Sequence, residues 1–295
     1  MRETDSFFKD LERQMKMHSA EEMSVSEKKE FLEKLMKEGF NNTPFDELSD
    51  EEQAVDTVYV AMQEDDEEKA YEFIDYALSL DTKCELAYEA LGDLADNQHV
   101  AGACFKMGAD IGLRKYLSKE DHAENNESVE VGMFYSMFET RPTIRCLYKY
   151  GDTLLGAGNY DDALEVFKEV LRLNTSDNMG ARYALLHLLI GNEEKEEFLR
   201  CYKKYKDDSS TQMKYAHLLF LYVFERENTK AIEKAKKEAL ESSKYIPKLL
   251  AKRQEDGSLH GAYAMGSKEE ADMYDFMFGQ FWEEVDGAIE MLNAK

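Results

Sequence analysis

Apolar residues recur every three or four positions along most of the chain, with polar residues between them. In residues 69–80, for example, Ala70, Phe73 and Ile74 would lie on one face of a helix. Residues 85–96 show the same pattern. No stretch has the strict alternation of apolar and polar residues that half-buried strands need, and the chain has only 3 prolines. The pattern therefore predicts an all-α protein.

Helix-start signals mark the beginning of the chain. Residues 1–45 are predicted to form amphipathic helices. Ser24 with Glu27, and Ser49 with Glu52, match the capping box S-x-x-E, in which each residue's side chain bonds the backbone N–H of the other. We expect one helix to begin after each of these serines.

One segment carries glycines, alanine and aromatic residues at positions that resemble a known repeat. Within residues 144–173 these positions are Leu147, Tyr150, Gly151, Leu154, Gly158, Tyr160, Ala163 and Phe167. The order is similar to that of the tetratricopeptide repeat (TPR), a helical hairpin of 34 residues. The resemblance implies an α-solenoid, in which such hairpins stack into a right-handed superhelix.

Each residue type in this segment has a physical role in a hairpin. Gly151 would let the two helices approach closely, and Gly158 would allow the tight turn because glycine readily adopts positive φ. Ala163 would lie where the second helix crosses the first, a place with no room for a larger side chain. Tyr160 and Phe167 would fill the space between the helices.

The repeat length can be tested elsewhere in the chain. Ala163 and Ala231 are 68 residues apart, twice the TPR length, and Ala231 also follows a turn. Halfway between them Glu197 stands where the small residue is expected, so we interpret the middle repeat as degenerate.

The register also extends toward the amino terminus. Ala70 would occupy the position of the small residue in an earlier hairpin. Gly92 follows Tyr88 and Leu91 at the same spacing as Gly151 follows Leu147 and Tyr150. Gly92 and Gly151 are 59 residues apart, which exceeds 34 by 25. An insertion of about that size at residues 113–140 accounts for the difference.

The sequence thus predicts about five hairpins and flanking segments. The expected segments are amino-terminal amphipathic helices (1–45), two hairpins (46–112), an insertion or loop (113–140), three hairpins (141–244) and a carboxyl-terminal capping segment (245–295).

A narrower resemblance rests on short motifs near both ends of the repeats. These are Glu139-Thr140-Arg141-Pro142 and the run from Gly266 to Ala271 ahead of Trp282. They look like a group of bacterial TPR proteins similar to the suppressor-of-tumorigenicity-7 family, over about residues 45–290. This resemblance implies no particular activity.

Charge is distributed unevenly. The formal net charge is −25, and residues 51–140 alone contain 22 Asp and Glu against 6 Lys and Arg. Such a surface repels nucleic acids and anionic membranes and attracts a basic partner. The alternative is that the acids only keep the surface solvated.

The sequence offers no catalytic or metal-binding motif. Cys84, Cys104, Cys146 and Cys201 are far apart, which argues against disulfides and a cysteine zinc site. The 6 histidines form no H-E-x-x-H motif, and carboxylate pairs are expected by chance among 62 acids. Because neither an apolar leader nor a membrane-length apolar run is present, we expect a cytoplasmic protein without enzymatic activity, metal or cofactor.

The TPR resemblance implies that the first helix of each hairpin lines a concave groove. By register, the candidate groove residues are Tyr59, Glu89, Asp93, Asp96, Arg145, Tyr148, Asp152, Arg182, Leu186, Phe220 and Phe224. This groove would be acidic in its first half and apolar in its second. A basic-and-apolar peptide or protein would fit it, whereas an acidic carboxyl-terminal peptide would meet like charge.

Two alternatives remain open at this stage. The carboxyl-terminal segment 245–292 could itself cover Leu186, Phe220 and Phe224, because the last repeat of a solenoid needs a cap. The amino-terminal helices 6–38 could instead dimerise, which would make the chain a self-assembling structural protein. The sequence does not determine the oligomeric state or identify the partner.

Overall fold

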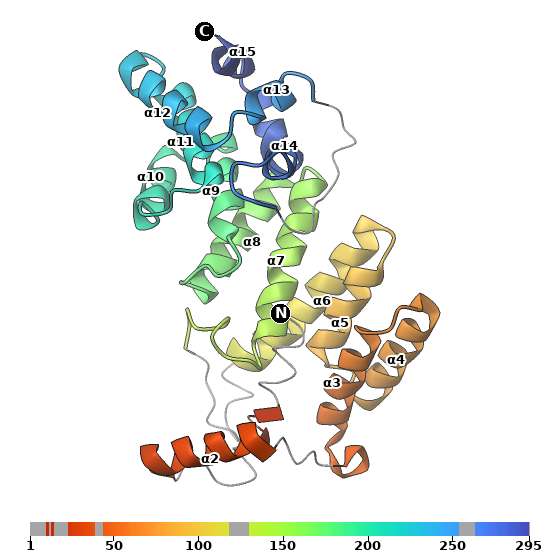
Figure 1. The fold of residues 1–295 in the computed structure, drawn as a ribbon. Helices are drawn as coiled ribbons and strands as arrows, with labels where there is room; N and C mark the ends of the chain where they lie inside the picture. Colours follow the sequence, from red (N-terminus) through yellow and green to blue (C-terminus); the bar gives the residue numbers. More distant parts are fainter. Residues whose placement is uncertain are drawn as a thin grey trace. The chain divides into compact units, whose positions relative to one another are not determined.

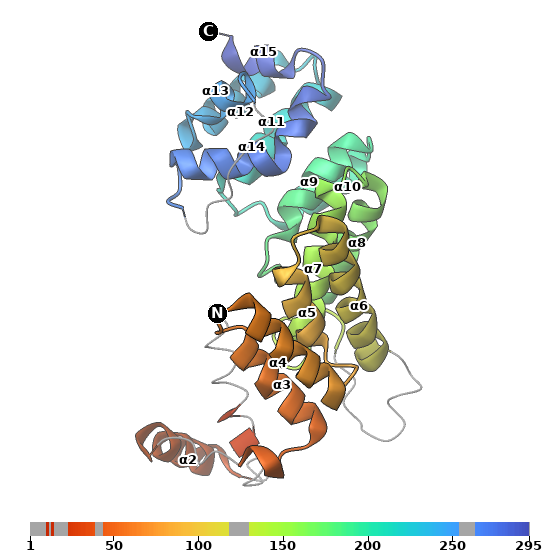
Figure 2. The same cartoon turned by 90° about the vertical axis from the view of Figure 1, so that its right-hand side faces the viewer.

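The protein is helical throughout the residues that its computed structural model describes. These are residues 10–11, 13–14, 23–38, 44–117, 130–253 and 263–294. None of them belongs to a strand, and consecutive helices pack in pairs as in an α-solenoid (Figures 1 and 2). The predicted all-α fold class is confirmed.

Contacts within the chain divide it into two compact units. The amino-terminal unit comprises Met1–Thr153 with Leu173–Thr175, and the carboxyl-terminal unit comprises Leu154–Arg172 with Ser176–Lys295. The division falls within α7 (Arg141–Gly156), a helix that the sequence assigned wholly to the segment 141–244.

Two hairpins make up the core of the amino-terminal unit. Helix α3 (Asp50–Ala61) pairs with α4 (Glu67–Leu80), α5 (Glu85–Leu94) pairs with α6 (Gln98–Leu117), and α5 also packs on α3 and α4. Ala54 and Val58 of α3 and Ile74 of α4 are fully buried, and Ala70 is 1% exposed. The first two hairpins of the chain thus run from Asp50 to Leu117.

Both predicted capping boxes form. At the start of α3, the Ser49 side chain accepts from the Glu52 N–H and the Glu52 carboxylate accepts from the Ser49 N–H. Ser24 and Glu27 make the same exchange ahead of α2 (Val25–Glu38). Most of the other helix predicted in residues 1–45 lies outside the described residues.

Glycines allow α6 to approach α5 and α7. A Cβ at Gly92 of α5 would overlap the Phe105 ring of α6, and one at Gly112 would overlap the Thr143 side chain of α7. At Gly108 a Cβ would lie 2.7 Å from Cys146 Sγ. Gly108 and Gly112 therefore allow neighbouring helices to approach closely. They are not part of a nucleotide-binding motif.

The predicted insertion is partly ordered structure. Helix α6 continues to Leu117, and residues 118–129 lie outside the described residues. Residues 130–140 turn back so that the Phe134 N–H donates to the Leu173 carbonyl at 3.0 Å. Phe134 is fully buried, and the Thr140 hydroxyl donates to its carbonyl. The end of the segment 113–140, predicted as an insertion or loop, is therefore held in place by a buried apolar side chain.

The carboxyl-terminal unit continues the pairing. Its helices are α8 (Tyr160–Leu173, whose last residue lies in the other unit), α9 (Ala181–Gly191), α10 (Lys195–Lys204), α11 (Thr211–Phe224), α12 (Thr229–Ser242), α13 (Ile246–Leu250), α14 (Lys268–Glu283) and α15 (Ala288–Asn293). Helix α9 packs on α10, and α11 packs on α12 (Figure 2).

The second helices of these pairs recur at the predicted interval. Helices α8, α10 and α12 begin at Tyr160, Lys195 and Thr229, which are 35 and 34 residues apart. Their fourth residues are Ala163, Phe198 and Ile232, and all three are buried. The small-residue register was therefore wrong at two places, because Glu197 and Ala231 each precede the buried residue by one position.

The other predicted structural residues of the strong repeat lie in the expected turn or are buried, except that Tyr160, expected between the helices of its hairpin, packs on Phe281 of α14. Gly158 has a φ of +74° in the turn before α8. Ala163 and Phe167 are fully buried, Gly151 is buried, and the Tyr160 ring packs 5.4 Å from that of Phe281.

The carboxyl-terminal segment packs over α9. Helix α14 packs on α9 as well as on α13 and α15 (Figure 1). Its start is fixed by Ser267, which caps the helix, and by Glu270, whose buried carboxylate accepts from the Gly266 N–H and from the Thr211 hydroxyl of α11. The Gly266–Ala271 motif noted in the sequence thus attaches this segment to the repeats.

The glycine packing leads to a first prediction. Gly112→Ala should lower the free energy of unfolding by about 1–3 kcal/mol through overpacking, although alanine is the better helix former by about 1 kcal/mol. Gly102→Ala should cost less, since its Cβ would lie 2.9 Å from Thr153 Oγ1 with the next atom at 3.4 Å. Urea unfolding monitored by circular dichroism tests this order, and equal stability of the two variants would contradict it.

Candidate functional site

The predicted acidic half of the groove is an ion-pair cluster between α5 and α7. Arg145 donates from Nε and Nη2 to the Glu89 carboxylate at 2.9 and 2.8 Å. Lys149 donates to Glu89 at 2.8 Å and to Asp93 at 2.7 Å. Glu89 and Asp93 are one helical turn apart on α5, as Arg145 and Lys149 are on α7, so the two pairs of charges match.

Burial makes this cluster a packing element. The Glu89 side chain is 3% exposed and that of Arg145 is 14% exposed. Burial alone would raise the pKa of Glu89, but the charges of Arg145 and Lys149 outweigh it and hold the pKa below its usual range. The expectation of a free acidic groove at Glu89 and Asp93 is therefore wrong, because cations of α7, the first helix of the next hairpin, neutralise these carboxylates.

The remaining groove candidates of this unit differ in exposure. Burial raises the pKa of Asp152 to about 7, and its Oδ1 has no hydrogen-bond partner in the described part of the chain. The carboxyl group of Asp152 is thus not the fully ionised, exposed group that the predicted acidic groove requires. Asp96 is exposed, while Tyr59 and Tyr148 are partly buried.

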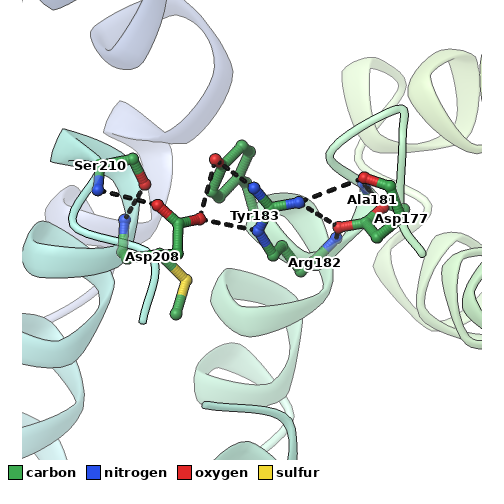
Figure 3. A network of polar contacts seen from close by, with 7 residues as sticks. Asp177, Ala181, Arg182, Tyr183, Asp208 and Ser210 are labelled. Atoms are coloured by element: carbon green, nitrogen blue, oxygen red, sulfur yellow. Dashed lines mark hydrogen bonds and ion pairs between the residues drawn. The ribbon is translucent and has the colours of Figure 1, made fainter. Parts of the chain in front are cut away.

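In the carboxyl-terminal unit, Arg182 is the centre of a polar network (Figure 3). Its Nη1 donates to Asp177 Oδ2 at 2.6 Å, and its Nε donates to Asp208 Oδ2 at 2.8 Å. Tyr183 joins the network by accepting from Arg182 Nη2 and donating to Asp208. Asp208 also accepts from the Ser210 N–H in the same loop. Its bonds to Arg182 and Tyr183 tie the loop between α10 and α11 to the start of α9.

Asp177 completes the network from the other side. Its carboxylate accepts from the backbone N–H groups of Ala181 and Arg182 and so caps α9 (Figure 3). Asp177 itself has a φ of 48°, a left-handed conformation that aspartate tolerates better than most residues. Arg182 was expected to line a groove, but two carboxylates already bind its guanidinium, which makes it a structural clamp.

The network also shifts the pKa values of its acids. Burial opposes the charge of Asp208, but the Ser210 N–H and the Arg182 guanidinium lower its pKa overall. At Asp177 burial prevails and the pKa is raised despite Arg182.

The apolar half of the predicted groove is closed. Leu186 is fully buried and Phe220 is 1% exposed, so neither is available to a partner. The Phe220 ring stacks on Phe198 at 4.2 Å and contacts Phe224, which is partly buried, at 5.0 Å. Helix α9 packs against α10, α11 and α14, which accounts for its burial.

The carboxyl-terminal segment, which was considered as a cover for Leu186, Phe220 and Phe224, packs on α9 at the neighbouring His187. The imidazole of His187 stacks on the Phe278 ring of α14, with centroids 4.1 Å apart. His187 Nε2 lies 3.0 Å from the Tyr274 hydroxyl, which also accepts from Trp282 Nε1. Three aromatic side chains of α14 thus join the core of the repeats.

An acidic surface lies on α4, the second helix of its hairpin, where no groove residue was predicted. Glu67, Glu68, Glu72 and Asp75 are exposed, and no ion pair joins them to any residue in the described ranges. Tyr71 and Tyr76 lie on the same exposed side of the helix, 38% and 48% exposed. From Asp50 to Asp81 the chain has 12 Asp and Glu and a single Lys, a signal that the sequence already contained.

The described residues contain neither a cluster of metal ligands nor a helix suited to a membrane. No three His, Cys, Asp or Glu side chains in those ranges are placed to hold a metal ion. No helix among them is both long and apolar enough to cross a bilayer.

The ion-pair cluster yields a second prediction. Glu89→Gln should lower the free energy of unfolding by about 3 kcal/mol, because it leaves two cations poorly compensated in a buried place. Asp93→Asn, on the same helix but at the exposed end of the cluster, should cost under about 1 kcal/mol. Urea unfolding at pH 7 tests both, and a larger loss for Asp93→Asn would contradict the assignment.

The His187 contact yields a third prediction. Burial lowers the pKa of His187 to about 4 from its usual 6.5, so the unfolded chain binds its proton at higher pH than the folded chain. Stability should therefore fall as the pH drops from about 6.5 toward 4, by about 3 kcal/mol from this group. Carboxylates titrate in the same range, so the measurement is the difference between wild type and His187→Gln in urea unfolding at pH 7 and 4.5. His187→Gln should flatten the dependence, whereas His99→Gln, at an exposed histidine, should leave it unchanged.

Comparison with known proteins places much of this architecture in one family. The model of a family described as transcriptional repressor TCF25 matches residues 114–261, which are 148 of the 295 residues. Comparisons with curated proteins and with solved structures found no match. The matched stretch includes the whole Arg182 network and both pairs α9–α10 and α11–α12. The chain belongs to the TCF25 transcriptional repressor family.

Proposed function

We propose that this protein is a non-catalytic, regulatory scaffold of TPR-type hairpins that binds a basic protein through its first hairpin, α3–α4. The observation that carries this proposal is the exposed face of α4, where Glu67, Glu68, Glu72 and Asp75 have no ion-pair partner among the described residues. Carboxylates beside exposed tyrosines suit Lys and Arg, which pair with the acids and pack on the rings.

The charges elsewhere support the choice of this hairpin. Cations of α7 neutralise Glu89 and Asp93, and Arg182 neutralises Asp177 and Asp208. Acids already paired within the chain would have to give up one partner to bind another, which lowers the net gain on binding. The unpaired acids of α4 would gain a partner and also steer its approach.

The hairpin type, the kind of partner and the location belong to the same proposal. The interval of 34 to 35 residues between second helices and the positive φ of Gly158 favour TPR hairpins. The family's description concerns transcription, and for this chain we propose contact with a protein rather than with nucleic acid, since its net charge is −25. A cytoplasmic location fits four cysteines that are all free thiols.

The fourth prediction tests the surface on α4. Glu68→Lys/Glu72→Lys should lose the proteins that the wild-type chain captures from lysate at low salt, because the variant repels a basic partner. A matched control is Glu233→Lys/Glu241→Lys on α12, which changes the net charge equally at exposed positions of the other unit. Mass spectrometry of the retained proteins reads out the result. Equal loss in both variants would mean that total charge, and not the α4 surface, governs binding.

A further inference from the structure

One arginine of the amino-terminal segment is inserted between two carboxylates of α3. Arg13 Nε donates to Glu52 Oε1 at 3.2 Å, and Arg13 Nη2 donates to Asp56 Oδ2 at 3.3 Å. The Arg13 side chain is 12% exposed, and Gln14 beside it is 2% exposed. Residues 10, 11, 13 and 14 are helical. A helical segment therefore packs on the face of α3 and buries its guanidinium there.

The two carboxylates are arranged to receive such a group. Glu52 and Asp56 are one turn apart on α3, so they lie on the same face of the helix. The capping box holds Glu52 in place, since its Oε2 accepts from the Ser49 N–H and hydroxyl while Oε1 accepts from Arg13. A planar guanidinium with several N–H groups can bond two carboxylates at once, whereas an ammonium is a point charge.

Charge around this position favours a basic ligand further. Arg13 and Lys69 are the cations that pair with the acids of the first hairpin in the described residues, against 12 Asp and Glu from Asp50 to Asp81. Arg13 belongs to the chain's own amino-terminal segment and not to the hairpin. It therefore reaches the α3 face in the way that the side chain of a bound polypeptide would.

We infer that Glu52 and Asp56 form a receptor for an arginine on a helical segment of a partner protein, and that Arg13 occupies this receptor within the same chain. The inference rests on the proposed function and adds an intramolecular competitor to it. A tethered segment acts at an effective concentration in the millimolar range, so a partner must displace it before it can bind. Weakening the Arg13 contact should then strengthen binding of a competing helix.

The fifth prediction uses the full-length chain and a defined probe. The probe is a fluorescent peptide that copies residues 6–20, and its binding is followed by anisotropy. Arg13→Ala in the protein should increase the affinity for this peptide about tenfold over wild type, because a charge-assisted contact of the competitor is lost. A peptide that itself carries Arg13→Ala should bind the Arg13→Ala protein about tenfold more weakly than the original peptide does.

Substitutions in the protein test whether the peptide binds at Glu52 and Asp56. In the Arg13→Ala protein, Asp56→Asn should reduce peptide affinity about tenfold, and it leaves the Ser49–Glu52 capping box intact. The matched control Asp65→Asn removes one exposed acid from the turn between α3 and α4 of the same hairpin and should leave the affinity unchanged. Equal losses in both variants would overturn the receptor on α3, since net charge alone would then explain binding.

Two further outcomes would overturn the inference. Equal affinity of the peptide for wild type and Arg13→Ala would show that the segment does not compete. A dimer by light scattering whose population falls on Arg13→Ala would place the segment on a second copy instead. Neither result would affect the capture experiment with Glu68→Lys/Glu72→Lys, so failure of this inference is distinguishable from failure of the proposed function.

Discussion

Close approach of neighbouring helices is the constraint on which the other features of this protein depend. An amphipathic hairpin cannot bury its apolar face alone, so each helix must contact more than one neighbour. Gly92, Gly108 and Gly112 remove side chains where α6 meets α5 and α7, and any Cβ there would meet a side chain. In the carboxyl-terminal unit, Ala163, Phe198 and Ile232 occupy equivalent buried positions with different volumes, so each helix pair packs with its own side chains.

This close packing also separates the acidic residues into two groups. Acids of α3 and α5 already pair with cations, as Glu89 pairs with Arg145 and Lys149 and as Glu52 pairs with Arg13. Acids on the outward side of α4 meet no such cation in the described residues and remain exposed. The total charge of the hairpins is therefore a poor guide to binding, because acids of the first group must give up a partner before they can bind another.

In the carboxyl-terminal unit, the segment that follows the repeats covers apolar residues of the repeats. Aromatic side chains of α14 pack on α9, and the Glu270 carboxylate anchors the start of α14 to Thr211 of α11. The segment after the repeats thus supplies the cap that a terminal repeat requires. At the other end of the chain, Arg13 packs on α3 through polar contacts that water or a competing arginine can replace. The proposed regulation therefore belongs to the amino-terminal segment.

The helical class, the interval between repeats and several helix starts can be predicted from the sequence alone. These follow from local chemistry: apolar spacing, the positive φ available to Gly158, and the capping boxes of Ser24 and Ser49. Which candidate groove residues stay accessible depends instead on packing between helices. Glu89 and Arg182 are charged residues of a kind common on exposed helix faces, but cations of α7 enclose the first and carboxylates of two loops bind the second. Leu186 lies in a helix that is apolar on nearly every side and that packs against three others. Glu89 and Arg145 are 56 residues apart, and Arg182 and Asp208 are 26 residues apart, so no local pattern of charge reveals these pairs.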